Sequence, residues 1–225
     1  MSVACQIQRI QEKLPSGITL VAVSKFQPPQ ALMEAYAVGQ RCFGESRAQE
    51  FVGKHAQLPE DMEWHFIGHL QTNKVKMVVG KATLIHSADS ENLLDALNKE
   101  AQKQGVVQDI LWELHVAQEE SKWGFATEAL SALAERALHG DWPHLRVCGL
   151  MGMASLVSDS QQIRAEFAQI KQAFDGLKAG AFASSPHFNI LSMGMSSDWP
   201  IAVEEGSTLI RVGSQIFAHT LIEGD

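Results

Sequence analysis

The chain has 225 residues, of which 45% are hydrophobic and 20% are charged, and its formal net charge at pH 7 is -8. This composition is ordinary for a globular protein with a full core, and the length suits one large domain or two small ones. The negative charge argues against a nucleic-acid partner, because such an interface needs a basic face.

The three cysteines, Cys5, Cys42 and Cys148, are widely spaced and form no CxxC pair. They therefore predict neither a disulfide framework nor a zinc ribbon. Residues 1–14 contain no continuous apolar segment, so we expect neither a secretory signal nor a membrane span. Together these features predict a cytoplasmic protein without a membrane partner.

Short apolar runs alternate with amphipathic segments along the whole chain. Strands are predicted at 20–23, 41–44, 63–67, 83–86, 109–116, 145–151, 187–192 and 207–212. Helices are predicted at 3–14, 29–38, 47–57, 73–79, 91–104, 127–139, about 159–177, about 198–205 and 215–219. Ser46, Thr72 and Ser90 are placed to cap three of them.

Alternation of strands with helices predicts a parallel sheet. Eight such units in a chain of this length predict a single α/β domain over residues 1–225, a (β/α)₈ barrel of the TIM type with an extra N-terminal helix. No GxGxxG follows the first strand, which argues against a dinucleotide-binding fold.

Lys25 follows the first predicted strand, and alternation puts it on the same face as Val21 and Val23. We expect a half-buried amine there, with a lowered pKa that would make it a nucleophile for an aldehyde. From this stretch alone, a lysine that simply leaves the strand into solvent is the alternative.

The last predicted strand contains an arginine, Arg211, between apolar residues, and Gly213 shares its face. Gly213 and Ser214 then open a short helix, whose free N–H groups suit an anion. The loop 192–196 follows the seventh strand, and the loops after strands seven and eight are the usual phosphate site of this fold. The sequence therefore predicts a phosphorylated aldehyde or ketone bound to Lys25 as a Schiff base. Both a sugar phosphate, as in a lysine aldolase, and pyridoxal phosphate fit.

Several stretches resemble the pyridoxal phosphate homeostasis protein family. They are Leu20-Val21-Ala22-Val23-Ser24-Lys25, Phe43-Gly44-Glu45, Trp64-His65-Phe66-Ile67-Gly68, Leu70-Gln71-Thr72-Asn73-Lys74, Ser121-Lys122-Trp123-Gly124, Gly149-Leu150-Met151, Leu191-Ser192-Met193-Gly194-Met195-Ser196-Ser197-Asp198, and Gly206-Ser207-Thr208 through Arg211-Val212-Gly213. They run in order over nearly the whole chain. The resemblance implies a single barrel related to the N-terminal domain of alanine racemase.

The resemblance also implies roles for individual residues. Lys25 would carry pyridoxal phosphate as a Schiff base, and Arg211 would face the pyridine nitrogen. The residues implied to hold the phosphate are Ser192, Gly213 and Ser214, with Met195 and Ser196 nearby. The chain departs from the family pattern at Ser46 and His115, where Asn is more usual, and at Ser214, where Thr is common.

The function implied by the resemblance is to keep free pyridoxal phosphate in balance in the cell without robust catalysis. Pyridoxal-phosphate-dependent apoenzymes are then candidate partners, and we expect a monomer. A racemase-like enzyme is the alternative, although no second acid–base residue can be named from the sequence. A lysine aldolase is the second alternative. His65 and His69 straddle a strand end rather than sharing a helix face, so they predict no zinc pair and no metal is expected.

Overall fold

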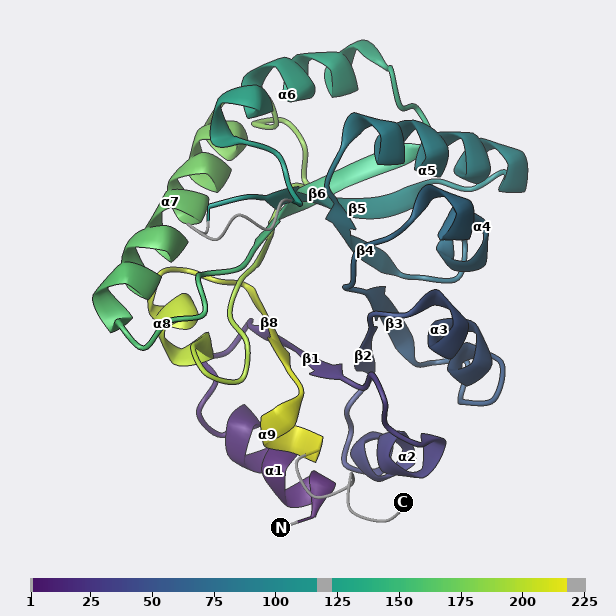
Figure 1. Ribbon diagram of the computed structural model, residues 1–225, viewed down its shortest axis with the longest axis vertical. Coiled ribbons are helices and arrows are strands. Elements are labelled where there is room, and N and C mark those ends of the chain that lie inside the picture. The colour runs from purple at the N-terminus through teal and green to yellow at the C-terminus, as the bar shows by residue number, and fades with distance from the viewer. Residues whose placement is uncertain (1, 117–122, 218–225) are drawn as a thin grey trace.

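Eight parallel strands close into a barrel in the part of the computed structural model that is described, residues 2–116 and 123–217 (Figure 1). The strands are β1 (Thr19–Val23), β2 (Cys42–Glu45), β3 (Glu63–Phe66), β4 (Leu84–Ala88), β5 (Gln108–Leu114), β6 (Leu145–Gly152), β7 (Ile190–Ser192) and β8 (Leu209–Val212). They pair in sequence order, and β8 returns to β1. The predicted (β/α)₈ barrel is confirmed.

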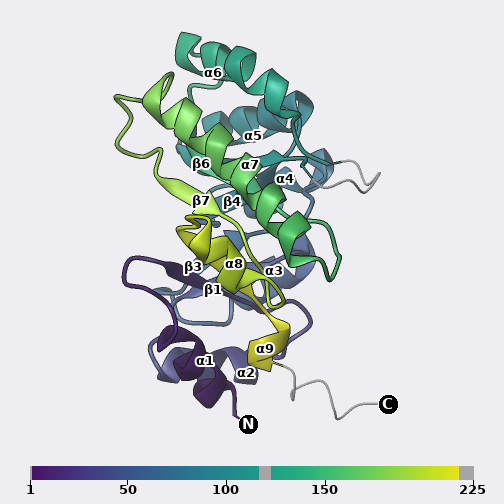
Figure 2. The ribbon, with the colours of Figure 1, turned by 90° about the vertical axis from the view of Figure 1, so that its left-hand side faces the viewer.

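Helices surround the barrel in Figure 1. They are α1 (Val3–Gln11), α2 (Pro29–Ala37), α3 (Ala48–His55), η1 (Thr72–Lys74), α4 (Val75–Val78), α5 (Glu91–Gln104), η2 (Thr127–Ala129), α6 (Leu130–His139), α7 (Ser160–Ala179), α8 (Trp199–Glu204) and α9 (Ser214–Phe217). The extra helix α1 buries Val3, Ile7 and Ile10 and packs against α2 and α9. The first and last helices of the described chain therefore lie side by side, as Figure 2 also shows.

Side chains alternate between the inside and the outside of the barrel, because each strand has a two-residue period. The inner apolar cluster consists of Val21, Leu84, Leu111, Cys148, Met151 and Leu209. Their strand neighbours, such as Ile85, Trp112 and Ile210, join a separate and larger core between the strands and the helices. On β8 this alternation turns Arg211 inward, since it lies between the outward-facing Ile210 and Val212.

Two of the predicted helix caps are wrong. Helix α3 begins after Arg47, not Ser46, and Gly68, two residues beyond β3, approaches Ser46 closely. A Cβ on Gly68 would lie 2.4 Å from the Ser46 carbonyl oxygen. Thr72 does not cap a helix but starts the 3₁₀ turn η1. Ser90 does precede α5 as predicted, although its hydroxyl donates to Asp89 at 2.9 Å rather than to the helix.

Within residues 2–116 and 123–217, no helix combines the length and the apolar character needed to cross a bilayer.

Candidate functional site

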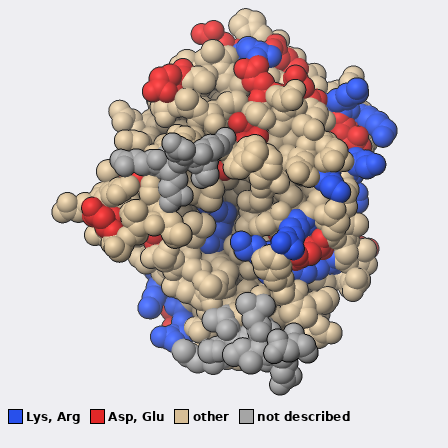
Figure 3. Space-filling view, viewed as in Figure 1, with Lys and Arg blue, Asp and Glu red and all other residues tan. Residues whose placement is uncertain are grey.

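The carboxyl ends of the strands meet at one mouth of the barrel, as parallel pairing requires. In the space-filling view, lysine and arginine side chains gather around a hollow near the middle of the face (Figure 3). Such a basic concavity favours anionic ligands. The residues that the sequence predicts for this mouth come from the ends of β1, β7 and β8.

Lys25 lies two residues beyond the end of β1 and is exposed. The prediction of a half-buried lysine is wrong, because the strand stops at Val23 and the chain turns, with the Gln27 N–H donating to the Ser24 carbonyl at 3.0 Å. Strand pairing puts the end of β1 beside the end of β8. Val23 packs against Gly213, the residue that follows β8, where an added Cβ would lie 3.2 Å from the Val23 Cβ. Lys25 therefore follows the strand that pairs with β8, close to the end of β8 in the register.

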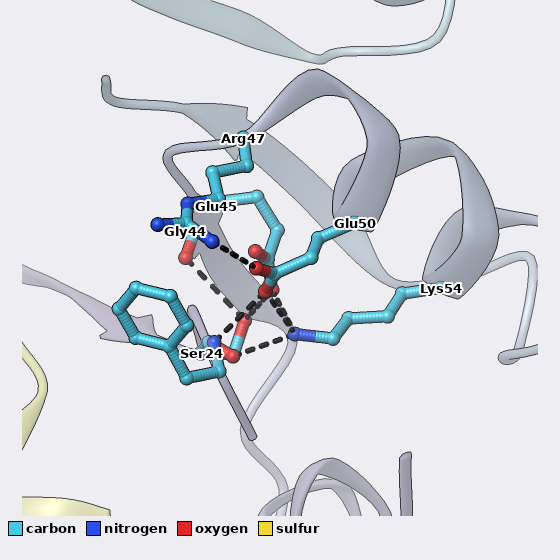
Figure 4. Close-up of polar contacts among 7 residues, drawn as sticks. Ser24, Gly44, Glu45, Arg47, Glu50 and Lys54 are labelled. Carbon is cyan, nitrogen blue, oxygen red and sulfur yellow. Dashed lines mark hydrogen bonds and ion pairs between the residues drawn. The ribbon is translucent and has the colours of Figure 1, made fainter. Parts of the chain in front are cut away.

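The backbone before Lys25 is fixed by a buried polar network from β2 and α3 (Figure 4). The Ser24 hydroxyl donates to Glu45 Oε1 at 2.7 Å. Lys54 Nζ donates to the Ser24 carbonyl and to Glu45 Oε1, each at 2.7 Å. Glu45 is fully buried, and burial raises the pKa of its carboxyl, against the opposing effect of Lys54 and Ser24. The network therefore holds the residue before Lys25 through both its hydroxyl and its carbonyl.

The backbone after Lys25 is held from the same helix. The Phe26 N–H donates to Glu50 Oε2 at 2.8 Å, and Phe26 adopts a φ of 64°, a conformation that non-glycine residues rarely take. The Arg47 guanidinium lies over the Phe26 ring at 4.5 Å. Residues on both sides of Lys25 are thus anchored, while its own side chain is left exposed.

Arg211 lies inside the barrel one layer below this mouth and is 4% exposed. Its Nη1 donates to the Ser192 carbonyl oxygen at 2.9 Å and to the Ser192 hydroxyl, and its Nη2 donates to the Gly152 carbonyl oxygen at 3.2 Å. Burial lowers the pKa of Arg211 to about 10, against the opposing charge of Glu113 and Asp198. At that pKa the guanidinium is still charged at neutral pH, and none of the described carboxylates forms an ion pair with it.

Ser192 belongs to a polar chain that crosses the barrel interior rather than to the open loop. His86 Nδ1 lies 3.1 Å from the Ser192 hydroxyl oxygen, and His86 Nε2 lies 2.9 Å from His65 Nδ1. Both histidines and Ser192 are buried. The Ser192 hydroxyl therefore already contacts Arg211 and His86. Its contact with a phosphate stays a prediction.

The loops after β7 and β8 are joined to each other at the mouth. The Gly213 N–H donates to the Ser196 hydroxyl oxygen at 3.2 Å, and Gln215 Nε2 donates to the Ser196 carbonyl oxygen at 2.6 Å. Ser214 is exposed at the start of α9, beside Gly213. Met195 is half-buried, and its N–H donates to the Asp198 carboxylate at 2.6 Å. Apart from Ser192, the predicted phosphate residues are thus brought together.

Gly194 gives the loop after β7 its shape, and we expect Gly194→Ala to destabilise the protein by about 2 kcal/mol or more. Its φ is +90°, and an added Cβ would lie 2.6 Å from the Ala202 Cβ and 2.8 Å from the Trp199 Cα. Gly176→Ala is the matched control, because its Cβ would meet nothing within 4 Å in helix α7. The control substitution should stabilise the protein by roughly 0.5–1 kcal/mol. Urea unfolding measures both, and equal effects of the two substitutions would contradict the argument.

A cavity of about 260 Å³ opens on the β5–β7 side of the mouth. Its lining includes Glu113 and His115 from β5 and the following loop, Trp123, and Met195 from the phosphate loop. Trp123 stacks on His69 with ring centroids 3.6 Å apart. The cavity therefore adjoins the loops after β7 and gives a bound ligand room to extend toward β5.

Glu113 is one of the titratable groups that line this cavity. It is 5% exposed, and burial raises its pKa from 4.5 to about 7, with a further increase from the charge of Asp89 and an opposing effect of Arg211. Between pH 4.5 and about pH 7, the folded protein therefore keeps a proton on Glu113, whereas the unfolded chain loses it.

We expect this difference to lower the free energy of unfolding as the pH rises from about 4.5 to about 7, by roughly 3 kcal/mol at most. Glu113→Gln removes the titration, so the variant should gain stability over the wild type through that window and keep the gain above it. Urea unfolding of the cofactor-free proteins at several pH values measures the difference. A pH-independent difference would show that Glu113 is not held neutral.

Comparison with known proteins places this site in a family. Residues 2–220 match the family model described as alanine racemase, N-terminal domain. The chain is 41% identical over 218 residues to the pyridoxal phosphate homeostasis protein of Aquifex aeolicus, covering 95% of this chain and 93% of that one. The chain belongs to the pyridoxal phosphate homeostasis protein family. The resemblance stated from the motifs is confirmed, and the family shares the alanine racemase N-terminal barrel.

Solved structures agree with the family assignment. PipY of Synechococcus elongatus PCC7942 is 37% identical, and its structure without pyridoxal phosphate has a TM-score of 0.89 to this chain, covering 96% of this chain and 100% of PipY. The PipY structure with pyridoxal phosphate bound has a TM-score of 0.86 with the same coverage. A family member with this fold and of this length therefore binds pyridoxal phosphate.

Sequence reasoning missed the supporting residues of the site. Lys54 looked like one more charge on a predicted amphipathic helix, and nothing in its spacing pointed to Ser24. Glu113 stood inside a predicted strand, and a charged residue in an apolar run, the signal that identified Arg211, could also have identified it. Ser121 and Lys122, which carry part of the motif resemblance, lie outside the described residues, as does the predicted end of the last helix.

Proposed function

We propose that this protein binds pyridoxal 5′-phosphate as a Schiff base on Lys25 and acts in the homeostasis of that cofactor. The observation that carries the proposal is the pairing of β1 with β8: the exposed Lys25 follows β1, and the buried Arg211 lies on β8. The loops after β7 and β8 are joined by a hydrogen bond. The PipY structure with bound cofactor supports it, since PipY shares the fold and 37% of the sequence.

The donor set fits the three parts of the cofactor. Lys25 suits the aldehyde, because a primary amine forms a Schiff base with it and the backbone that carries this amine is anchored on both sides. Arg211 suits the pyridine nitrogen: it is charged, lies on the inner face of the adjacent strand, and is held by Ser192 and Gly152. A guanidinium beside that nitrogen disfavours its protonation, which weakens the cofactor as an electron sink.

The phosphate suits the loops after β7 and β8. Ser196 and Gly213 already form a hydroxyl–amide pair, and Ser214 adds an exposed hydroxyl beside them. We assign the phosphate to these residues, with Met195 at the side of the cavity. Ser192 acts in this proposal by holding Arg211, although the family resemblance alone assigns it to the phosphate.

We further propose that binding and release, rather than robust catalysis, are the main activity. The relatives are called homeostasis proteins, and a guanidinium at the ring nitrogen does not favour carbanion chemistry. Apoenzymes that require pyridoxal phosphate are the proposed recipients, and we propose that the protein acts as a monomer.

The visible absorbance spectrum of the purified protein, recorded before and after borohydride reduction, tests the proposal. We expect a yellow protein that is bleached by reduction, and a pyridoxyl mass fixed on the tryptic peptide that contains Lys25. A colourless protein that stays unmodified after incubation with pyridoxal phosphate would overturn the proposal and leave the sugar-phosphate aldolase as the alternative.

One observation favours a second candidate, a weak racemase-like activity. Glu113 faces the barrel interior near the mouth, and its pKa of about 7 suits a residue that moves a proton at neutral pH. The sequence had offered no such group. Loss of the α-deuteron from a deuterated amino acid, in wild type but neither in Glu113→Gln nor in Lys25→Ala, would support this activity, and equal rates in all three would exclude it.

A further inference from the structure

Three metal-ligating side chains lie together at the opposite, N-terminal end of the barrel. Cys42 of β2 pairs with Glu63 of β3, and His65 follows two residues later on the same inward face. The sulfur of Cys42, a carboxylate oxygen of Glu63 and a ring nitrogen of His65 all lie within 4.8 Å of one another. Of the three, only His65 is connected through described residues to the site above, by way of His86 and Ser192.

The cluster lines a cavity of about 450 Å³. The cavity is bounded by inward-facing residues near the starts of several strands, among them Thr19, Leu84 and Leu209. The three ligand groups are therefore accessible to a small ion, and the cavity leaves space for water as an additional ligand.

One nitrogen of the His65 ring is held by a hydrogen-bond partner, as in a typical metal ligand. It is 5% exposed, and its Nδ1 lies 2.9 Å from His86 Nε2. Its Nε2 has no hydrogen-bond partner among the described residues, although the ring lines the cavity. Histidine ligands usually have their second nitrogen fixed by a partner in this way.

We propose that this end of the barrel binds one zinc-like divalent cation through Cys42 Sγ, the Glu63 carboxylate and His65 Nε2. Thiolate, carboxylate and imidazole ligands together suit zinc, with water as the fourth ligand, whereas calcium and magnesium prefer oxygen ligands alone. The ligands come from two neighbouring strands, so spacing along the sequence does not reveal them. His69, which lies four residues after His65, instead forms a hydrogen bond between its Nδ1 and the Asp89 carboxylate at 2.8 Å.

Binding exchanges one proton for the cation. In the structure the Cys42 thiol donates to Glu63 Oε2 at 3.0 Å. The S–H bond breaks, a sulfur–metal bond forms, and the proton leaves to solvent, while the carboxylate turns its oxygen to the cation. No oxidant or reductant is required.

The interior hydrogen bonds accommodate this state. With the cation on Nε2, His65 keeps its proton on Nδ1 and donates to His86 Nε2, and His86 then donates from Nδ1 to the Ser192 hydroxyl oxygen. That oxygen also accepts from Arg211, and its two lone pairs allow both bonds. The cation thus fixes the proton positions along a chain that ends at Arg211.

Cobalt and zinc titrations of the untagged, chelator-treated wild-type chain test the proposal. We expect one Co²⁺ per chain with a thiolate-to-cobalt charge-transfer band, and Zn²⁺ should displace it. Cys42→Ser should lose the band and weaken zinc binding by more than ~100-fold, because removing a ligand costs more than removing the partner of a ligand. The matched control is Cys5→Ser, which removes a thiol on helix α1 and should change nothing.

Glu63→Gln gives a second test at an exposed position, where loss of folding is not expected. It should weaken zinc binding at least tenfold and retain the charge-transfer band, since Cys42 remains. Absence of saturable zinc binding by the wild type, or equal zinc affinities of wild type and Cys42→Ser, would overturn the proposal. Pyridoxal phosphate binding should persist in both variants, so this result is independent of the proposed function.

Discussion

Lys25→Ala is expected to abolish covalent retention of pyridoxal phosphate. The wild-type chain, incubated with the cofactor and reduced with borohydride, should carry a pyridoxyl group on the Lys25 peptide in nearly every molecule. The variant should show only background labelling, because the aldehyde then has no amine after β1 to bond. Intact-mass measurement gives the labelled fraction directly.

The matched control is Lys13→Ala, which removes an exposed lysine from the turn after α1 and should leave labelling unchanged. Labelling of Lys25→Ala at the wild-type level would show that another lysine holds the cofactor. Both proteins should unfold at the same urea concentration, because neither side chain is buried.

Lys54→Met is expected to destabilise the protein by about 3–5 kcal/mol, the usual cost of removing one partner of a buried ion pair. Lys54 is 7% exposed and Glu45 is fully buried, and their charged atoms lie 2.7 Å apart. Without the ammonium, Glu45 is left ionised in the interior with only the Ser24 hydroxyl, or it must take up a proton. The loss of stability caused by Lys54→Met should therefore be larger at pH 8 than at pH 5, and urea unfolding at the two pH values would measure it.

A double-mutant cycle separates the charge from the packing. Glu45→Gln combined with Lys54→Met removes both charges, so the double variant should recover about 2 kcal/mol relative to Lys54→Met alone. A double variant no more stable than Lys54→Met would show that the cost came from lost contacts instead. Lys54→Met should also reduce the labelling of Lys25, because the Ser24 carbonyl loses its anchor.

The proposed site depends on supporting residues such as Lys54 and Ser192 as much as on the residues that would face the ligand. Lys25 is exposed, and ordering a long exposed side chain costs entropy. Its proposed reaction with the aldehyde therefore depends on a backbone that is held at Ser24 and Phe26. The same logic applies to Arg211, which is held by Ser192 and Gly152. The backbone beside Lys25 and the guanidinium of Arg211 are therefore both fixed by polar contacts from other elements.

The sequence by itself determined the barrel, because apolar runs and amphipathic segments alternate at the right spacing and parallel strands bring their carboxyl ends to one mouth. It also predicted that Lys25, Ser196 and Gly213 lie at that mouth, since each follows a strand. The two-residue period predicted the inward face of Arg211 but gave the wrong exposure for Lys25, which lies beyond the end of its strand.

Only the tertiary structure decided the contacts between side chains that are distant along the chain. Lys54 reaches Ser24 across 30 residues, and His86 reaches Ser192 across 106. No local pattern encodes such pairs, because they depend on strand register and barrel closure. The exposure of Lys25 and the gathering of Cys42, Glu63 and His65 follow from the same cause: strand ends and inward faces are set by the neighbouring strand, not by the segment itself.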